Sequence, residues 1–256
     1  MYHHWIIPKS TRLSFNGFLR QVKDKKGNKV LDDNGKPTKQ HSKASLNYIF
    51  WWELSLAIFS ILGAFNVVPL ALASYRGSDS FVEALCTQGL EDTDTRYFWI
   101  FLFNASKLFE FGDTLMVVLR KKPLILLQHY HHLATMLYCW HGTLVVAKLN
   151  STNPYFAAMN LIVHSVMYTW YAATRTGWRS PKWMMVMVTL IQLVQMVLGC
   201  IIVMTAQTNH KDCVWTTEDP IGAKCATFMY ASYLVLFGKL FYDNYIAKKP
   251  KTTKKE

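Results

Sequence analysis

Residues 183–205 read WMMVMVTLIQLVQMVLGCIIVMT, an apolar run without a charged side chain. As an α-helix, this run is long enough to cross the roughly 30 Å hydrocarbon core of a bilayer. Five further apolar stretches of similar length lie at 47–74, 97–119, 124–145, 155–174 and 226–246. Because backbone groups in lipid must hydrogen-bond within their own segment, we expect six transmembrane helices and an all-α integral membrane protein.

Polar, basic segments flank the apolar part of the chain. We expect residues 1–45 to form a basic cytoplasmic N-terminal segment, 46–247 the transmembrane domain, and 248–256 a basic cytoplasmic tail. Within the first segment, residues 24–37 read DKKGNKVLDDNGKP, which is rich in turn-forming residues. This composition predicts a short hairpin or a loop.

The charge of the chain is unevenly distributed. The 256 residues carry a formal net charge of +12, yet only 17% are charged and 51% are hydrophobic. The low charged fraction argues against a disordered tail or a simple nucleic-acid binder, and the length excludes a small disulfide-held scaffold. A cytoplasmic N-terminus puts 21 of the 28 Lys and Arg residues on the cytoplasmic side. The positive-inside rule therefore predicts that both termini are cytoplasmic.

Two of the five cysteines fall in loops on the opposite side of the membrane, where oxidation is permitted. Cys86 lies between the first and second apolar stretches, and Cys213 lies between the fifth and sixth. We predict a disulfide between them. Cys225 is the rival partner, and free thiols are the other alternative, because sequence alone does not set connectivity.

Polar and ionisable side chains recur within four of the apolar stretches, at a similar depth in the cytoplasmic half of the membrane. They occur in KLFEFGDT (107–114), QHYHHLAT (128–135), NLIVHSVMYTWY (160–171) and TLIQLVQ (189–195). Ionisable groups are costly in lipid, so they normally face an interior and serve a function. The pattern predicts a polar chamber open to the cytoplasm, with His131, His132 and His164 as its functional cluster.

Some of these polar residues could instead have a purely structural role. Lys107 and Glu110 would then be an intrahelical ion pair, and Gln192 and Gln195 would hold neighbouring helices together. The adjacent histidines of the second segment look like part of a histidine box, so metal sites are alternatives. A di-iron site requires more histidines than the chamber supplies, and adjacent rings on a helix diverge by about 100°, which disfavours a zinc site. We expect no metal.

The four segments resemble the ELO-type very-long-chain fatty-acid elongases, which are membrane 3-oxoacyl-CoA synthases. That family is marked by K-x-x-E-x-x-D-T, H-x-x-H-H, N-x-x-x-H-x-x-M-Y-x-x-Y and T-x-x-Q-x-x-Q, in the order found here. The resemblance covers about residues 46–247. This chain departs from the family in having Gln128 where the histidine box begins, and in showing six spans where the family usually has seven.

The resemblance implies condensation of a long-chain acyl-CoA with malonyl-CoA in the endoplasmic reticulum membrane, giving a 3-oxoacyl-CoA two carbons longer, CO2 and CoA. It implies that His131, His132 and His164 are catalytic, and we expect His131 to carry the acyl group as an acyl-imidazole. The expected substrate-binding residues are Lys107, Glu110, Asp113, Gln128, Asn160, Tyr168, Tyr171, Gln192 and Gln195. Candidates for the CoA phosphates at the cytoplasmic rim are Arg120, Lys121, Lys122, Arg175, Arg179 and Lys182.

We expect no tightly bound cofactor, only the two CoA thioesters as substrates. The expected partners are the lipid bilayer, the reductases and dehydratase of the elongation cycle, and a second copy in a homodimer, but no nucleic acid. Two other classes remain open, namely a transporter that uses the chamber as a midplane site and an iron-dependent desaturase or hydroxylase. The acyl-chain signals conflict, since Gln128 resembles the polyunsaturated branch and the surrounding segments resemble the saturated and monounsaturated branch, which we favour.

Overall fold

The computed structural model describes residues 19–21, 39–41, 43–86, 94–119, 125–145 and 152–247. Two strands of three residues, β1 (Leu19–Gln21) and β2 (Lys39–His41), pair antiparallel. The long helices are α1 (Lys43–Arg76), α3 (Asp94–Leu119), α4 (Leu126–Val145), α5 (Asn153–Arg175), α6 (Lys182–Thr208) and α8 (Pro220–Phe241). The short elements are α2 (Phe81–Cys86), η2 (His210–Asp212), α7 (Val214–Glu218) and a terminal π-helix, η3 (Tyr242–Ile246).

The long helices coincide with the six apolar stretches. Three helical segments in the described part of the chain are long and apolar enough to cross a membrane, by length and composition: Asn47–Arg76, Lys182–Thr208 and Pro220–Ile246. That α3, α4 and α5 also cross remains a prediction. The β1–β2 ladder is a small departure from an all-α fold, and it flanks the turn-rich stretch 24–37, which lies outside the described residues.

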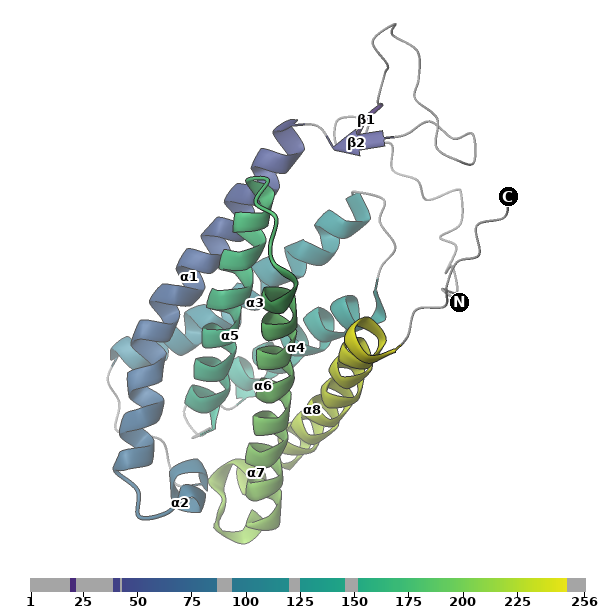
Figure 1. Cartoon of the computed structure of the whole chain (residues 1–256). Coiled ribbons are helices and arrows are strands. Elements are labelled where there is room, and N and C mark those ends of the chain that lie inside the picture. The colour runs from purple at the N-terminus through teal and green to yellow at the C-terminus, as the bar shows by residue number, and fades with distance from the viewer. Residues whose placement is uncertain are drawn as a thin grey trace, which may run out of the picture.

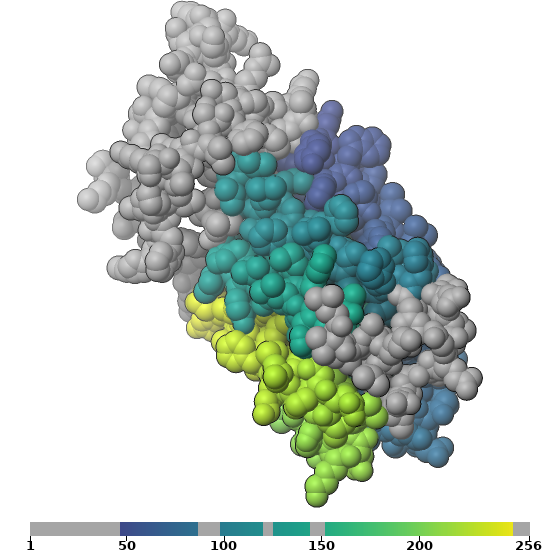
Figure 2. All heavy atoms as spheres, turned by 180° about the vertical axis from the view of Figure 1, so that it is seen from behind, coloured from purple at the N-terminus to yellow at the C-terminus, as the bar shows by residue number. Residues whose placement is uncertain are grey.

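Contacts between the long helices form a closed ring in the order α1, α3, α4, α8, α6 and α5. Figure 1 shows the two strands and the α5–α6 turn at one end of the bundle, here called the strand end. The short helices α2 and α7 lie at the opposite end, here called the disulfide end (Figure 1). From behind, α3 and α4 cover this side between α1 and α8 (Figure 2). Residues from helices far apart in sequence therefore reach one interior.

Local sequence signals set two helix ends that matter for the interior. Gly177 has a φ of +92°, which favours glycine, and it lets the chain reverse between α5 and α6. The carboxylate of Asp219 accepts a hydrogen bond from the backbone N–H of Gly222 at 2.9 Å, and Pro220 occupies the first turn of α8. This cap explains why α8 begins before the apolar stretch at 226–246.

The bundle buries aromatic and small apolar residues inside and presents large apolar side chains outside. Near the disulfide end, Trp215 is fully buried in a core cluster where Phe156 stacks on Tyr230. On the outer surface, Phe65 is 76% exposed and Phe228 is 71% exposed. Apolar outer faces of this extent are what contact with lipid tails requires.

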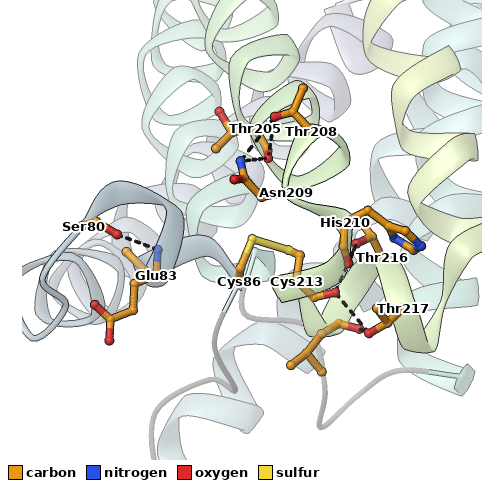
Figure 3. The surroundings of a disulfide bond; sticks show 12 residues. Ser80, Glu83, Cys86, Thr205, Thr208, Asn209, His210, Cys213, Thr216 and Thr217 are labelled. Atoms are coloured by element: carbon orange, nitrogen blue, oxygen red, sulfur yellow. Dashed lines mark hydrogen bonds between the residues drawn. A yellow bond between two sulfur atoms is a disulfide. The ribbon is translucent and has the colours of Figure 1, made fainter.

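A disulfide ties α2 to the segment that precedes α7. It joins Cys86 and Cys213, both of which are buried (Figure 3). The hydroxyl groups of Thr216 and Thr217 each donate to the backbone carbonyl of Cys213 at 3.1 Å. The structure thus contains the pairing that the sequence favoured, whereas Cys225 is a free, exposed thiol.

We predict that replacing both bonded cysteines, Cys86→Ala with Cys213→Ala, lowers the midpoint of thermal unfolding in detergent. The bond joins residues 127 positions apart, and loops of this size correspond to a stabilisation of about 5 kcal/mol through the unfolded chain. Reductant should lower the midpoint of the unmodified protein similarly, whereas Cys225→Ala should leave it unchanged. An unaltered midpoint in the double variant would contradict this assignment.

Candidate functional site

A cavity of about 520 Å³ lies within the helix ring towards the strand end. All six long helices contribute side chains to its wall. The wall includes most of the residues predicted from sequence: Asp113, Gln128, His131, His132, Asn160, His164, Tyr168, Tyr171, Arg175, Gln192 and Gln195. The three histidines of the predicted cluster therefore meet at one cavity.

A second, smaller cavity of about 50 Å³ extends from this point towards the disulfide end. Its far wall includes Asn104 and Gly142, and its lining is mostly apolar and aromatic. Four residues line both cavities, namely His131, Asn160, Gln195 and Met196. His131 thus stands at the junction of a wide polar cavity and a narrow apolar one.

A closed ring of hydrogen bonds and ion pairs links α3 to α5 beside the larger cavity. Lys107 donates from Nζ to Oε1 of Glu110 and to Oδ1 of Asn160, both at 2.7 Å. Because this fixes the orientation of the Asn160 amide, its Nδ2 donates to Nε2 of His164 at 3.2 Å. Nδ1 of His164 then carries the hydrogen and lies 3.4 Å from Oε1 of Glu110. Both ring nitrogens of His164 are therefore engaged.

The charged members of this ring are buried behind the cavity wall. The side chains of Lys107 and Glu110 are 2% and 9% exposed, and the Lys107 ammonium also lies 4.1 Å from the centre of the Phe103 ring. Buried charges are tolerated where they are paired and hydrogen-bonded, as these are. The structure does not bring Lys107 and Glu110 to the wall of either cavity, so they reach it only through Asn160 and His164.

The two adjacent histidines of α4 have different surroundings. The ring of His131 packs on Tyr233 at 4.7 Å between centroids and against the edge of Phe237 at 5.9 Å. Nδ1 of His132 lies 3.4 Å from the hydroxyl of Thr114. No hydrogen bond from a described side chain reaches either ring nitrogen of His131, whose imidazole is therefore left available at the cavity junction.

Helix α1 supplies two site residues that the sequence interpretation missed. The indole N–H of Trp52 donates to Asp113 Oδ1 at 2.7 Å, and Asp113 Oδ2 accepts from the Tyr168 hydroxyl at 2.7 Å. Next to Trp52, the carboxylate of Glu53 pairs with Arg175 of α5. An ionisable residue within an apolar stretch was the available signal for Glu53, by the same argument that identified the other four segments.

The family model described as ELO: GNS1/SUR4 family matches residues 25–253 of this chain. The chain belongs to this family. It is 34% identical over 210 residues to Very long chain fatty acid elongase 6 of Homo sapiens, covering 80% of this chain and 76% of that protein. It is 36% identical to the protein of the same name in Drosophila melanogaster, covering 77% of this chain and 62% of that one. Putative fatty acid elongase 3 of Caenorhabditis elegans is 37% identical, covering 80% of this chain and 63% of that protein.

Membership of the ELO family, together with the apolar helices, establishes that this is a membrane protein. No group of three or more histidine, cysteine, aspartate and glutamate side chains within the described segments is arranged to hold a metal ion. The zinc alternative raised by the paired histidines therefore has no ligand set in this part of the chain.

The remaining predicted residues of this ELO member lie on the cavity wall, at the exposed α5–α6 turn, or outside the described residues. On the wall, the amide of Gln192 donates to Met167 Sδ at 3.1 Å, and Gln195 is buried and lines both cavities. Arg179 and Lys182 are exposed at the α5–α6 turn, away from the cavity lining. Residues 120–122, also predicted to meet CoA phosphates, lie outside the described residues.

The ELO motif KLFEFGDT contains a glycine whose role the structure explains. A Cβ placed on Gly112 would lie 2.6 Å from Cζ2 of Trp52, so only glycine lets the indole reach Asp113. We predict that Gly112→Ala displaces Trp52 and destabilises the protein by about 1–3 kcal/mol, as overpacking does.

The matched control is Gly238→Ala in α8, where a Cβ would meet no atom within 4 Å. There the higher helix propensity of alanine should leave the unfolding midpoint unchanged or slightly raised. Equal midpoints of thermal unfolding for Gly112→Ala and Gly238→Ala would show that the close packing of Gly112 against Trp52 does not contribute to stability.

Proposed function

We propose that this protein is a fatty-acid elongase that condenses a long-chain acyl-CoA with malonyl-CoA to a 3-oxoacyl-CoA two carbons longer. One observation carries the proposal beyond family membership. An imidazole without a hydrogen-bonding partner among the described residues, that of His131, stands where a polar cavity meets an apolar one. A second histidine, His164, is held on the same wall by a buried charged network. A thioester at this junction has its head in polar and its tail in apolar surroundings.

In the first half-reaction, His131 is the nucleophile. A ring nitrogen attacks the acyl thioester carbonyl, the N–C bond forms and the C–S bond breaks. The imidazole proton leaves with the CoA sulfur, which departs as the thiol. The support for His131 in this role is that no described residue hydrogen-bonds to its ring nitrogens. Both nitrogens of His164 are instead engaged, and Nδ1 of His132 lies near Thr114.

In the second half-reaction, malonyl-CoA loses CO2 and its α-carbon attacks the acyl carbon held on His131. The new C–C bond forms, the C–N bond breaks, and the departing imidazolate takes up one proton from water, which regenerates the imidazole. Decarboxylation supplies the carbanion, so no strong base is required. His164, His132 and Asn160 surround this point and would stabilise the enolate oxygen or carry protons, with the Lys107 charge acting through Asn160.

The polar lining of the larger cavity and the apolar lining of the smaller one support one direction for the substrates in this proposal. Both CoA thioesters enter the larger cavity from the strand end, and the acyl tail points from His131 towards the smaller cavity. That cavity, at about 50 Å³, must widen to hold a long chain. The distribution of basic residues supports placing the strand end in the cytoplasm, where CoA thioesters are found. All six long helices then cross the endoplasmic reticulum membrane, and the 3-oxoacyl product passes to the reductases and dehydratase of the elongation cycle.

The direct test is product formation. Purified protein is incubated with labelled malonyl-CoA and a panel of saturated, monounsaturated and polyunsaturated acyl-CoAs, with no reductant. We expect a labelled 3-oxoacyl-CoA two carbons longer than the primer, together with release of CO2. Failure with every primer class would refute the proposal.

We predict that His131→Ala reduces turnover by at least about 10³-fold while the protein still folds, because it removes the nucleophile but leaves the buried charged network intact. His129→Ala is the matched control on the same helix. Its ring contacts the carbonyl of Ile125 at 3.0 Å and lines neither cavity, so turnover should stay near that of the unmodified protein. Near-normal turnover by His131→Ala would show that the nucleophile is misassigned.

A further inference from the structure

A buried carboxylate holds an arginine at the strand end of the larger cavity. Glu53 of α1 is 6% exposed, although it lies within an apolar stretch. It accepts hydrogen bonds from Nε of Arg175 at 2.9 and 3.1 Å and from Nη2 at 2.6 Å. Both side chains line the cavity, and that of Arg175 is 27% exposed.

This pairing uses one edge of the guanidinium group and leaves the other unused. No hydrogen bond from Nη1 of Arg175 to a described residue is present, whereas Nε and Nη2 both bond to Glu53. The guanidinium is a rigid planar fork, so fixing one edge also fixes the direction of the other. Arg175 is thus an oriented donor on the cavity wall, and it has N–H groups that bond to no described residue.

The separation of Arg175 from His164 along α5 matches the length of the pantetheine arm of CoA. Arg175 follows His164 by eleven residues of α5, which is about 16 Å along the helix axis. The pantetheine arm of CoA spans about 16 Å from its sulfur to the nearest phosphorus when extended, with bond lengths like those of a peptide chain. A thioester carbon beside the histidines therefore brings the CoA diphosphate to the level of Arg175.

We propose that Arg175 binds the diphosphate of the CoA thioesters and that Glu53 is a positioning residue that acts only through Arg175. This rests on the proposed function and deepens it, since it selects one residue from the basic groups at the strand end and names the part of CoA that it recognises. Arg179 and Lys182 are exposed at the turn and have no such fixed geometry.

Glu53 has two opposite effects on phosphate binding by Arg175, one through orientation and one through charge. The Glu53 carboxylate offsets part of the positive charge of Arg175, which alone would weaken phosphate binding. The diphosphate, however, approaches the edge facing away from Glu53, and a charge-assisted bond to a pre-oriented guanidinium is strong. Without its partner, Arg175 is free to leave the cavity wall for solvent. When the Glu53 carboxylate is removed, we therefore expect the loss of a fixed Arg175 orientation to weaken diphosphate binding more than the gain in net positive charge strengthens it.

The first experiment compares substrates with and without phosphates. Arg175→Gln is assayed with acyl-CoA and malonyl-CoA, and then with the matching acyl- and malonyl-pantetheine thioesters. Relative to the unmodified protein, KM for the CoA thioesters should rise about 10-fold with kcat unchanged, because a charged hydrogen bond is lost. KM for the pantetheine thioesters should not change. An equal rise for both substrate types would overturn the diphosphate assignment.

The second experiment tests the positioning role of Glu53. Glu53→Gln should raise KM for CoA thioesters at least about threefold, and the double variant Glu53→Gln/Arg175→Gln should be no worse than Arg175→Gln alone. A lower KM for Glu53→Gln, or additive effects in the double variant, would overturn this role. The double variant leaves no unpaired buried charge, so it preserves the test of Arg175 if either single variant fails to fold.

A matched control removes another acid–base pair near the same end of the bundle. Lys239 and Asp243 form an exposed pair at 2.8 Å outside the cavity, so Lys239→Gln/Asp243→Asn should leave both KM values unchanged. Failure of the proposed function is distinguishable from failure of this inference. If the unmodified protein gives no product with CoA thioesters, the proposed function is refuted. If it gives normal product but Arg175→Gln has no selective effect on CoA thioesters, only the role of Arg175 is refuted.

Discussion

The buried ion pair between Lys107 and Glu110 is the constraint on which the rest of the site depends. Its charges are stabilised in an apolar bundle because Asn160 and His164 of the neighbouring helix complete the ring of contacts. That ring holds α3 against α5 and fixes the amide of Asn160 and the tautomer of His164. A residue pair that lines neither cavity thus determines how both ring nitrogens of His164 are engaged.

Helix α1 carries none of the four family motifs, yet it closes the site. Trp52 holds Asp113 from one side while Tyr168 holds it from the other, and Glu53 holds Arg175. These contacts hold α1 against both α3 and α5 at the wall of the larger cavity. The same architecture separates functions along the bundle axis, with charged groups at the strand end, histidines in the middle, and an apolar pocket towards the disulfide end.

Much of this arrangement could be predicted from sequence, because its signals are local. Apolar length predicted the helical stretches, and the spacing of polar residues brought the three histidines to one wall. The rest depends on packing between distant segments. Three features have no local signature: the ring order of the helices, the placement of Lys107 behind Asn160, and the packing of the Tyr233 and His131 rings across α4 and α8. Glu53 did have one, as an acid within an apolar stretch.

The central claim is that an acyl group is carried on His131 between the two half-reactions. It is tested most directly by incubating the protein with a long-chain acyl-CoA in the absence of malonyl-CoA and mapping covalent acyl groups by peptide mass spectrometry. The account predicts one acyl group on the peptide that contains His131, which disappears when malonyl-CoA is added. An unmodified His131 peptide, or an acyl group on another residue that malonyl-CoA discharges, would contradict it.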